Sequence, residues 1–297
     1  MQEEKLITIL TPAYNRAHLL TRLFESLTKQ IVMNFEWIIV DDGSNDNTEQ
    51  VVENFYNDKF QIRYYKKNNG GKHTAVNYGM NFVKTELTFI VDSDDCLLSY
   101  ATKEIEYYYD KYKTQKDGIC SFSFLRCYKN GKPIVSLDRD EFVGKYITTR
   151  IKENRPGDMA EVFFSRVLKE FPFPVFQTEK FLSEDVVWIP MGAKYLSVYI
   201  NKAIYQCEYL EGGLTDNDKK AKFDSPIGSM CRGVALMTKE CGMKSKIKGA
   251  IIYDCYKIAA LKKYKKIDKE VMPKGNVLCF LLFPIGIVFY YRWRKKN

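Results

Sequence analysis

Short apolar segments alternate with amphipathic ones through the first 95 residues of the chain. The apolar segments at residues 6–10, 37–40 and 87–91 have the length and residue types of buried strands, and residues 61–65 are predicted to form a further strand. Apolar residues at helical spacing lie between them, around residues 19–27, 51–55 and 75–83. This alternation predicts an α/β fold with a doubly wound, mostly parallel sheet, right-handed crossovers and helices on both faces.

Polar or glycine-rich segments follow each of the four predicted strands. They occupy residues 11–16, 41–46, 68–72 and 92–95. In doubly wound sheets, ligands bind beyond the carboxyl ends of the strands, so these segments predict a nucleotide-type site. The chain has neither a GxGxxG motif nor a Walker-type phosphate loop, which argues against a dinucleotide or Walker-type site.

The fourth of these segments contains three carboxylates, those of Asp92, Asp94 and Asp95. Such closely spaced charges repel one another, and desolvation would raise their pKa values. A divalent cation relieves both costs, and carboxylate oxygens suit Mg²⁺ or Mn²⁺. The alternative is a solvated acidic turn.

Three further side chains have the chemistry that a nucleotide requires. Tyr14 offers a flat ring for a base, and Asp42 can accept a hydrogen bond from the imide N–H of uracil. Lys72 follows two glycines that let the backbone approach closely, so it is a candidate to meet a phosphate. The structural alternatives are a rim aromatic, a turn with a helix N-cap, and an ordinary exposed lysine.

Four motifs together resemble glycosyltransferase family 2, which has the GT-A fold. They are Thr-Pro-Ala-Tyr-Asn-Arg at 11–16, Val-Asp-Asp-Gly-Ser at 40–44, Asn-Gly-Gly-Lys at 69–72 and Asp-Ser-Asp-Asp at 92–95. The resemblance covers residues 5–210 and implies inverting transfer from a nucleotide-sugar, usually a UDP-sugar, with Mn²⁺ or Mg²⁺ at the DxD motif. The donor-binding residues that it implies are Pro12, Ala13, Tyr14, Arg16, Asp42, Lys72, Asp92 and Ser93. The implied metal ligands are Asp94, Asp92 and Asp95, and which of them bind directly stays open.

The family also uses a general base from a later acidic motif, which residues 183–188 match in position and context. The resemblance therefore implies Asp185, with Glu184 beside it, as the catalytic residues. A structural alternative is the first turn of a helix, where carboxylates favour the macrodipole. Trp188 is a candidate contact to the acceptor sugar, and a core tryptophan is its alternative.

The remainder of the first 224 residues predicts further elements. We expect a helix at 99–113, a strand at 118–128, and a hairpin through Asn130-Gly131 into a second strand at 132–137. Residues 140–182 are expected to be irregular. The last expectations are closing strands at 196–200 and 203–209, and then a lid or linker at 211–220.

The net charge of +9 is concentrated at the C-terminus. Residues 225–297 hold 16 Lys/Arg and 4 Asp/Glu, whereas residues 1–224 hold 30 and 33. The tail predicts two lysine-rich helices over 225–266 and then 17 uncharged residues from 275 to 291, just short of the ~18–20 of a spanning helix. Basic flanks on both sides favour an in-plane or re-entrant membrane segment at 276–291. A buried C-terminal helix is the alternative, and a nucleic-acid partner is not expected because the body of the chain is acidic.

These patterns predict a division into a GT-A domain at 1–224 and a basic helical region at 225–297. Within the first, residues 1–98 would form the nucleotide-binding half and 99–224 the acceptor half. Eight cysteines without a CxxC pair indicate free thiols in a reducing compartment, and the first residues do not resemble a signal peptide. We therefore expect a cytoplasmic protein that associates peripherally or monotopically with the inner face of the cytoplasmic membrane.

The expected reaction is transfer of one sugar to a saccharide acceptor, plausibly lipid-linked, in bacterial surface-polysaccharide assembly. Processive synthases of the family carry several spans and a Gln-x-x-Arg-Trp motif, whereas here Arg292-Trp293 follows Phe289. Two alternatives remain. A nucleotidyltransferase would have a glycine- and arginine-rich signature near the first strand, and a non-catalytic nucleotide- or membrane-binding scaffold would lack some of the carboxylates.

Overall fold

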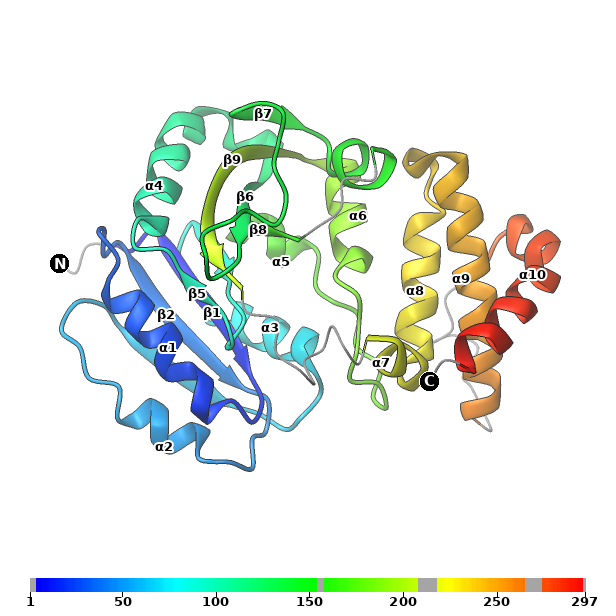
Figure 1. Ribbon diagram of the computed structural model, residues 1–297, viewed down its shortest axis with the longest axis horizontal. Coiled ribbons are helices and arrows are strands. Elements are labelled where there is room, and N and C mark those ends of the chain that lie inside the picture. The colour runs from blue at the N-terminus through cyan, green and yellow to red at the C-terminus, as the bar shows by residue number, and fades with distance from the viewer. Residues whose placement is uncertain (1–3, 154–157, 208–217, 265–273, 296–297) are drawn as a thin grey trace. The chain divides into compact units, whose positions relative to one another are not determined.

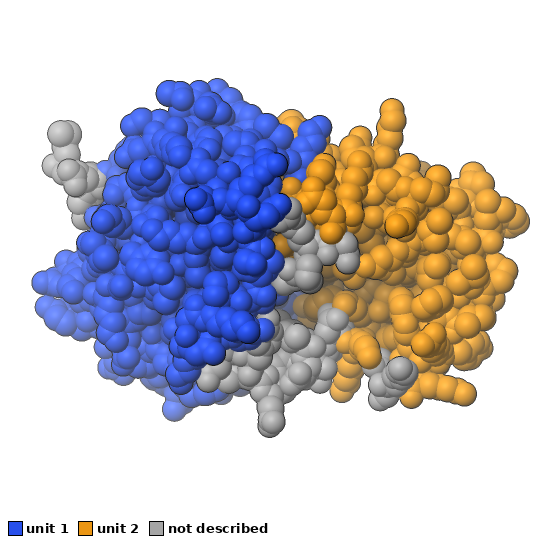
Figure 2. Space-filling view, turned by 45° about the horizontal axis from the view of Figure 1, so that its top comes forward, with its two compact units in different colours: residues 1–145, 156–172, 195–208 blue, residues 146–155, 173–194, 209–297 orange. Residues whose placement is uncertain are grey.

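The structure is a computed structural model that describes residues 4–153, 158–207, 218–264 and 274–295. It divides into two compact units, which Figure 2 colours separately. Unit 1 comprises residues 1–145, 156–172 and 195–208, and unit 2 comprises 146–155, 173–194 and 209–297. This grouping does not test the predicted functional division after residue 224, which stays a prediction.

Unit 1 is built on one mixed sheet with the strand order β3-β2-β1-β4-β8-β6-β9-β5, and β7 pairs with β9 at the side. The pairs β1–β2, β1–β4, β2–β3 and β6–β9 are parallel, and β8 runs antiparallel to both of its neighbours. The predicted α/β fold class is confirmed. The strands are β1 (Ile7–Ala13), β2 (Phe35–Asp41), β3 (Ile62–Lys66), β4 (Leu87–Ile90), β5 (Cys96–Leu97), β6 (Ile119–Cys127), β7 (Glu141–Gly144), β8 (Met159–Phe164) and β9 (Leu196–Gln206).

Helices pack on both faces of the parallel strands, beside β1 and β2 in Figure 1. The Phe24 ring of α1 (Ala17–Thr28) stacks on Trp37 of β2, with 6.4 Å between the centroids. On α3 (Lys72–Met80), a Cβ at Gly79 would lie only 3.0 Å from the Val40 side chain of the same strand. Because side chains alternate along a strand, Trp37 and Val40 point to opposite faces, and so α1 and α3 cover opposite sides of the sheet.

The other helical segments of unit 1 follow the predicted spacing where the sequence was strongly periodic. The predicted helix at 99–113 and strand at 118–128 are confirmed as α4 and β6. The helices and turns are α2 (Thr48–Glu53), α4 (Ala101–Tyr112), the 3-10 segment Lys113–Gly118 and α5 (Ser165–Glu170).

The expectation that residues 140–182 are irregular is wrong. This segment forms β7, the π-helical segment Ile147–Lys152 of unit 2, β8 and α5. The strand β8 lies between β4 and β6 and is almost entirely buried. Glu161 interrupts its apolar residues, so the sequence of β8 shows neither an unbroken apolar run nor a strict alternation.

Two further strand predictions need correction. Residues 128–131 do turn, with Gly131 at φ +79° and its N–H donating to the Tyr128 carbonyl at 2.8 Å, but 132–137 form no strand. Pairing there ends in a single bridge between Cys127 and Pro133, since proline has no N–H for a ladder. The two predicted closing strands form one continuous strand, β9. Its pairing with β6 shows register shifts but is not interrupted into two strands.

Unit 2 is helical in its described part. The predicted pair of helices after residue 225 is confirmed as α8 and α9, whose backbones approach closely where Gly233 meets Gly249. The buried carboxylate of Glu179 accepts hydrogen bonds from the first-turn N–H groups of Ile227 and Gly228 and so caps α8. The helices are α6 (Asp185–Lys194), α7 (Asp218–Asp224), α8 (Pro226–Leu236), the 3-10 turn Lys239–Cys241, α9 (Gly242–Lys263) and α10 (Val277–Arg294).

Candidate active site

The register of the parallel strands brings the four motif segments to one edge of the unit 1 sheet. Strand β1 pairs Ala13 with Asp41 of β2 and Leu10 with Ile90 of β4. Strand β2 in turn pairs Asp41 with Lys66 of β3. The residues that follow these positions are the predicted donor-binding and metal-binding residues, so the sheet gathers them beyond its carboxyl edge.

Asp42 anchors the glycine loop of the third motif. The residue is buried, and its side-chain oxygens accept hydrogen bonds from Gly70 N at 3.0 Å and Gly71 N at 2.6 Å. The Lys67 ammonium forms an ion pair with the same carboxylate at 2.6 Å. Gly71 has φ +94°, a conformation that favours glycine. Asp42 therefore has a structural role that sequence reasoning missed, beside the base contact predicted for it.

The first and second motif segments are joined by hydrogen bonds. Asn15, which takes φ +54°, donates its N–H to Ser44 Oγ at 2.8 Å. Asn45 donates its N–H to Asn15 Oδ1 at 2.9 Å, and Ser44 donates its N–H to Asp41 Oδ1 at 2.7 Å. These contacts hold the two loops in one arrangement at the sheet edge.

The predicted donor residues of the first motif differ in their exposure. Pro12 and Ala13 are buried at the end of β1, whereas the Tyr14 ring is 42% exposed. The Arg16 guanidinium donates to the Asn15 carbonyl at 3.3 Å. Tyr14 is thus the side chain of this motif with accessible apolar surface for a planar base.

Asp92 is held by two cations and by Tyr205. Lys72, the first residue of α3, forms an ion pair with Asp92 at 2.6 Å. Burial by itself would raise the pKa of Asp92, but the charges of Lys72 and Arg126 outweigh it and hold the pKa below its usual value. The Asp92 N–H donates to the Tyr205 hydroxyl at 3.0 Å.

The pKa values of the two neighbouring carboxylates are raised, in contrast to that of Asp92. Burial and the charge of Asp92 raise the pKa of Asp94. The same two causes raise the pKa of Asp95 to about 7, although a hydrogen bond from Tyr205 opposes the shift. Ser93, between them, is buried. The segment therefore concentrates negative charge that a nearby cation would stabilise.

Arg126 and Tyr205 were not predicted from the sequence. The Arg126 guanidinium lies 4.4 Å from the centroid of the Tyr205 ring and donates from Nε to the Met159 carbonyl at 3.0 Å. The two residues are register partners in the β6–β9 pair. One signal was available, because Arg126 is the one charged residue in the otherwise uncharged run of β6.

The carboxylates of the acidic segment are oxygen ligands of the kind that Mg²⁺ and Mn²⁺ prefer. In the described residues, no group of three His, Cys, Asp or Glu side chains is arranged to hold a metal by itself. Mg²⁺, however, commonly binds through one or two carboxylates together with substrate phosphates and water. Asp92 and Asp94 interact electrostatically, so their carboxylates fit an ion whose coordination is completed by a diphosphate.

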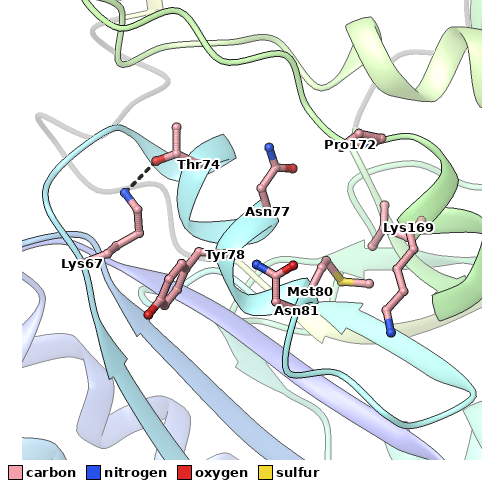
Figure 3. Close-up of a pocket in the computed structure, with 9 residues that line it drawn as sticks. Lys67, Thr74, Asn77, Tyr78, Met80, Asn81, Lys169 and Pro172 are labelled. Carbon is pink, nitrogen blue, oxygen red and sulfur yellow. Dashed lines mark hydrogen bonds between the residues drawn. The ribbon is translucent and has the colours of Figure 1, made fainter.

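A pocket of about 670 Å³ lies in unit 1 beside this site. Figure 3 shows the side chains of α3 that line it and the hydrogen bond from Lys67 to Thr74, which measures 2.9 Å. Lys169 and Pro172 line the opposite side. Lys67 lines this pocket and also forms the ion pair with Asp42, so one lysine connects the pocket to the glycine loop.

The predicted catalytic carboxylate lies in unit 2, at the first position of α6. Asp185 Oδ2 accepts a hydrogen bond from Arg232 Nε at 2.8 Å, and Oδ1 accepts one from the Tyr146 hydroxyl at 3.3 Å. Glu184 immediately precedes the helix. Asp185 therefore combines the predicted helix first turn with a fixed orientation, and Arg232 and Tyr146 are contacts that the sequence did not reveal.

The other predictions in this region have mixed outcomes. The Trp188 side chain is 7% exposed, and its ring packs edge-on against Phe173 at 5.5 Å, as the core alternative expects. Its contact with an acceptor stays a prediction. The expected lid or linker at 211–220 lies largely outside the described residues. In the part of the chain that is described, α10 is long and apolar enough to cross a membrane by length and composition.

Comparison with known proteins shows that the chain belongs to glycosyl transferase family 2. The family model described as Glycosyl transferase family 2 matches residues 8–170. Over 207 residues the chain is 27% identical to the "GalNAc(5)-diNAcBac-PP-undecaprenol beta-1,3-glucosyltransferase" of Campylobacter jejuni, covering 66% of this chain and 62% of that protein. It is 38% identical over 92 residues to "Glycosyltransferase GlyG" of Streptococcus pneumoniae, 31% of each chain. The chain thus spans less than two thirds of the length of these relatives.

Solved structures share the fold at low sequence identity. The crystal structure of S. aureus TarS 1–349 in complex with UDP-GlcNAc has a TM-score of 0.65 and 17% identity, covering 97% of this chain and 81% of that one. The mannosyltransferase PcManGT from Pyrobaculum calidifontis, in complex with GDP-Man and Mn²⁺, has a TM-score of 0.56 and 13% identity, covering 99% and 83%. These likenesses confirm the GT-A fold class.

Proposed function

Because the chain belongs to glycosyl transferase family 2, we propose that it transfers a single sugar from a nucleotide-sugar to a hydroxyl of a saccharide acceptor, with inversion. The observation that carries the proposal is the register of β1, β2, β3 and β4, which gathers four motif segments at one sheet edge. Ligands of doubly wound sheets bind at this edge.

The proposed donor is a UDP-sugar. The exposed Tyr14 ring would stack on the base, and Asp42 would accept from the uracil imide while holding Gly70 and Gly71. Lys72 would bind the diphosphate, at a position where it already faces Asp92. A fold neighbour with bound UDP-GlcNAc supports the choice of nucleotide by analogy.

The proposed cofactor is Mn²⁺ or Mg²⁺, held by Asp94 with Asp92 or Asp95. When bound, such an ion stabilises the departing diphosphate as a Lewis acid. Tyr205 would orient the segment, because it accepts a hydrogen bond from Asp92 N and donates one to Asp95. Arg126 would supply a fixed positive charge behind it.

The proposed general base is Asp185, with Glu184 as the alternative. It would accept the proton of the acceptor hydroxyl as that oxygen attacks the anomeric carbon. Arg232 and Tyr146 would hold the carboxylate in a fixed orientation. A positioned base of this kind typically contributes ~10²–10⁴-fold in rate. An acceptor contact of Trp188 would require its buried ring to become accessible.

The proposed acceptor is a lipid-linked saccharide at the inner face of the cytoplasmic membrane, in surface-polysaccharide assembly. The relative whose name includes PP-undecaprenol supports this choice, as does the exposed apolar helix α10. The protein would then be cytoplasmic and associated with the membrane without crossing it.

The test is a thermal-shift titration of the full chain with UDP, with and without Mn²⁺. We expect a metal-dependent increase in Tm, because a ligand that binds only the folded state stabilises it by mass action. Asp94→Ala should lose the increase, whereas Asp110→Ala, which removes an exposed carboxylate of α4, should keep it. A shift with GDP, CDP or dTDP but not with UDP would overturn the donor. No shift with any nucleotide would favour the non-catalytic scaffold.

A further inference from the structure

The helix α10 has two apolar faces, and the described residues of the chain cover only one of them. Cys279, Gly286 and Tyr290 are buried, and Leu282 and Trp293 pack beside them on the core of unit 2. At 100° per residue these positions form one stripe. The opposite stripe is exposed, with Phe280 at 82%, and it comprises Val277, Phe280, Leu281, Ile287, Val288 and Tyr291. A helix that is apolar all round is normally buried on every side or in contact with lipid.

The covered stripe is closely packed. A Cβ at Gly286 would lie 2.5 Å from Asp254 Cβ of α9, so the two helices touch with no room for a larger residue. The Lys262 ammonium of α9 lies 4.7 Å from the centroid of the Tyr290 ring. Because α10 is held by contacts of this kind, its outer face is a fixed surface of unit 2.

The charged side chains on α10 and immediately before and after it in the sequence are all basic. Residues 274–295 contain no Asp or Glu, and Arg292, Arg294 and Lys295 follow the apolar face. Lys262 of α9 lies 5.3 Å from the centroid of the Tyr291 ring, which brings the basic end of α9 to the same place. An apolar helix face beside clustered cations is complementary to a bilayer that carries anionic headgroups.

We propose that the exposed face of α10 is the membrane-docking surface and that α10 lies in the plane of an anionic bilayer while its other face stays packed on α9. This inference rests on the proposed membrane association but not on the transfer reaction. Spanning is disfavoured, although the length of α10 would allow it, because the lysine-rich helix α9 packs on its covered face and would have to enter the bilayer with it. A second copy is disfavoured because pairing two such faces would bring together basic helices without a balancing carboxylate.

The first experiment is co-sedimentation of the full chain with vesicles of phosphatidylcholine alone or with added phosphatidylglycerol. We expect binding to the anionic vesicles that weakens as salt increases. The double variant Phe280→Asp with Val288→Asp should bind roughly tenfold less or weaker still, because two apolar side chains no longer enter the lipid. The matched control is Ile31→Asp with Tyr56→Asp, two exposed apolar residues of unit 1, and it should bind like the wild type.

The second experiment separates an in-plane helix from a spanning one. Lys274→Cys and Lys295→Cys are reconstituted in sealed vesicles and labelled with a membrane-impermeant maleimide, with the wild-type chain as background for its native thiols. Labelling of both from the outside supports the in-plane position, and protection of either one overturns it.

Other outcomes are equally decisive. Equal binding of the double variant and the wild type would overturn the docking surface. So would a dimer, seen by light scattering, that the double variant abolishes while neither protein binds vesicles. Vesicle binding without any nucleotide shift would support the docking surface and contradict the proposed reaction. A nucleotide shift without vesicle binding would support the proposed reaction and overturn the docking surface.

Discussion

The ion pair between Asp42 and Lys67 should contribute measurably to the stability of unit 1. The Asp42 side chain is 4% exposed and that of Lys67 17%, so the pair is largely removed from water. In Asp42→Asn, the amide group would present N–H donors toward Lys67 or toward Gly70 and Gly71, which are donors themselves. The substitution therefore leaves buried donors without an acceptor.

The expected cost follows from these contacts. Removing one partner of a buried ion pair costs about 3–5 kcal/mol. We expect the lower end, about 3 kcal/mol, because Lys67 also donates to the Asn68 carbonyl and to Thr74 Oγ1 and keeps those bonds. For a chain of this size each kcal/mol lowers Tm by about 2–4 °C, so the expected decrease is about 6–12 °C.

The assay is a double-mutant cycle by urea unfolding, with wild type, Asp42→Asn, Lys67→Met and the double variant. Because Lys67→Met removes the charge that Asp42 balances, the double variant should be destabilised by less than the sum of the two single variants. Additivity within about 0.5 kcal/mol would refute the coupling. A loss of transfer activity in Asp42 variants can be assigned to the base contact only at temperatures where the variant remains folded.

Three further predictions concern unit 2. Asp185→Asn should lower kcat roughly 10²–10⁴-fold in a steady-state transfer assay, and a loss below tenfold would move the role of base to Glu184. Gly249→Ala would place a Cβ 2.6 Å from the Gly233 carbonyl oxygen, so it should lower the free energy of unfolding by about 1–3 kcal/mol. Urea unfolding measures this loss, and an unchanged midpoint would contradict the close helix contact. Burial raises the pKa of Asp254 from 3.8 to about 6, with Lys257 opposing the shift. The folded chain therefore binds the extra proton between these values, and stability should fall as pH rises through that window. Asp254→Asn should remove this dependence in Tm measurements from pH 4 to 7, and an unchanged slope would show that Asp254 is not its source.

The site could be predicted from the sequence as far as its parts are local. The motif at 92–95 was identifiable because three carboxylates directly follow an apolar strand. The anchoring role of Asp42 was not, because its partners Gly70 and Gly71 are 28 and 29 residues away. Arg126 and Tyr205 are farther apart still and meet only through the register of β6 with β9.

The fold, like the site, was predictable where the pattern is local and not where it depends on residues far apart in the sequence. Strands β1, β2 and β4 were predicted because each contains a short apolar run between helical segments of clear spacing, and β3 because it lies between two of those helical segments. Strand β8 was missed because its position between β4 and β6 is a property of the whole sheet and not of the residues at 159–164. A hairpin signal at Asn130-Gly131 likewise gave the turn but not the second strand, because Pro133 cannot continue the ladder.

The sequence by itself determined the α/β alternation, the position of the polar segments at strand ends and the apolar character of α10, because each is a local pattern of spacing and composition. The tertiary structure alone decided which groups face each acid: Lys72 at Asp92, Lys67 at Asp42 and Arg232 at Asp185. It also decided which side of α10 is covered, because a helix that is apolar all round has no inner face until α9 packs against one side of it.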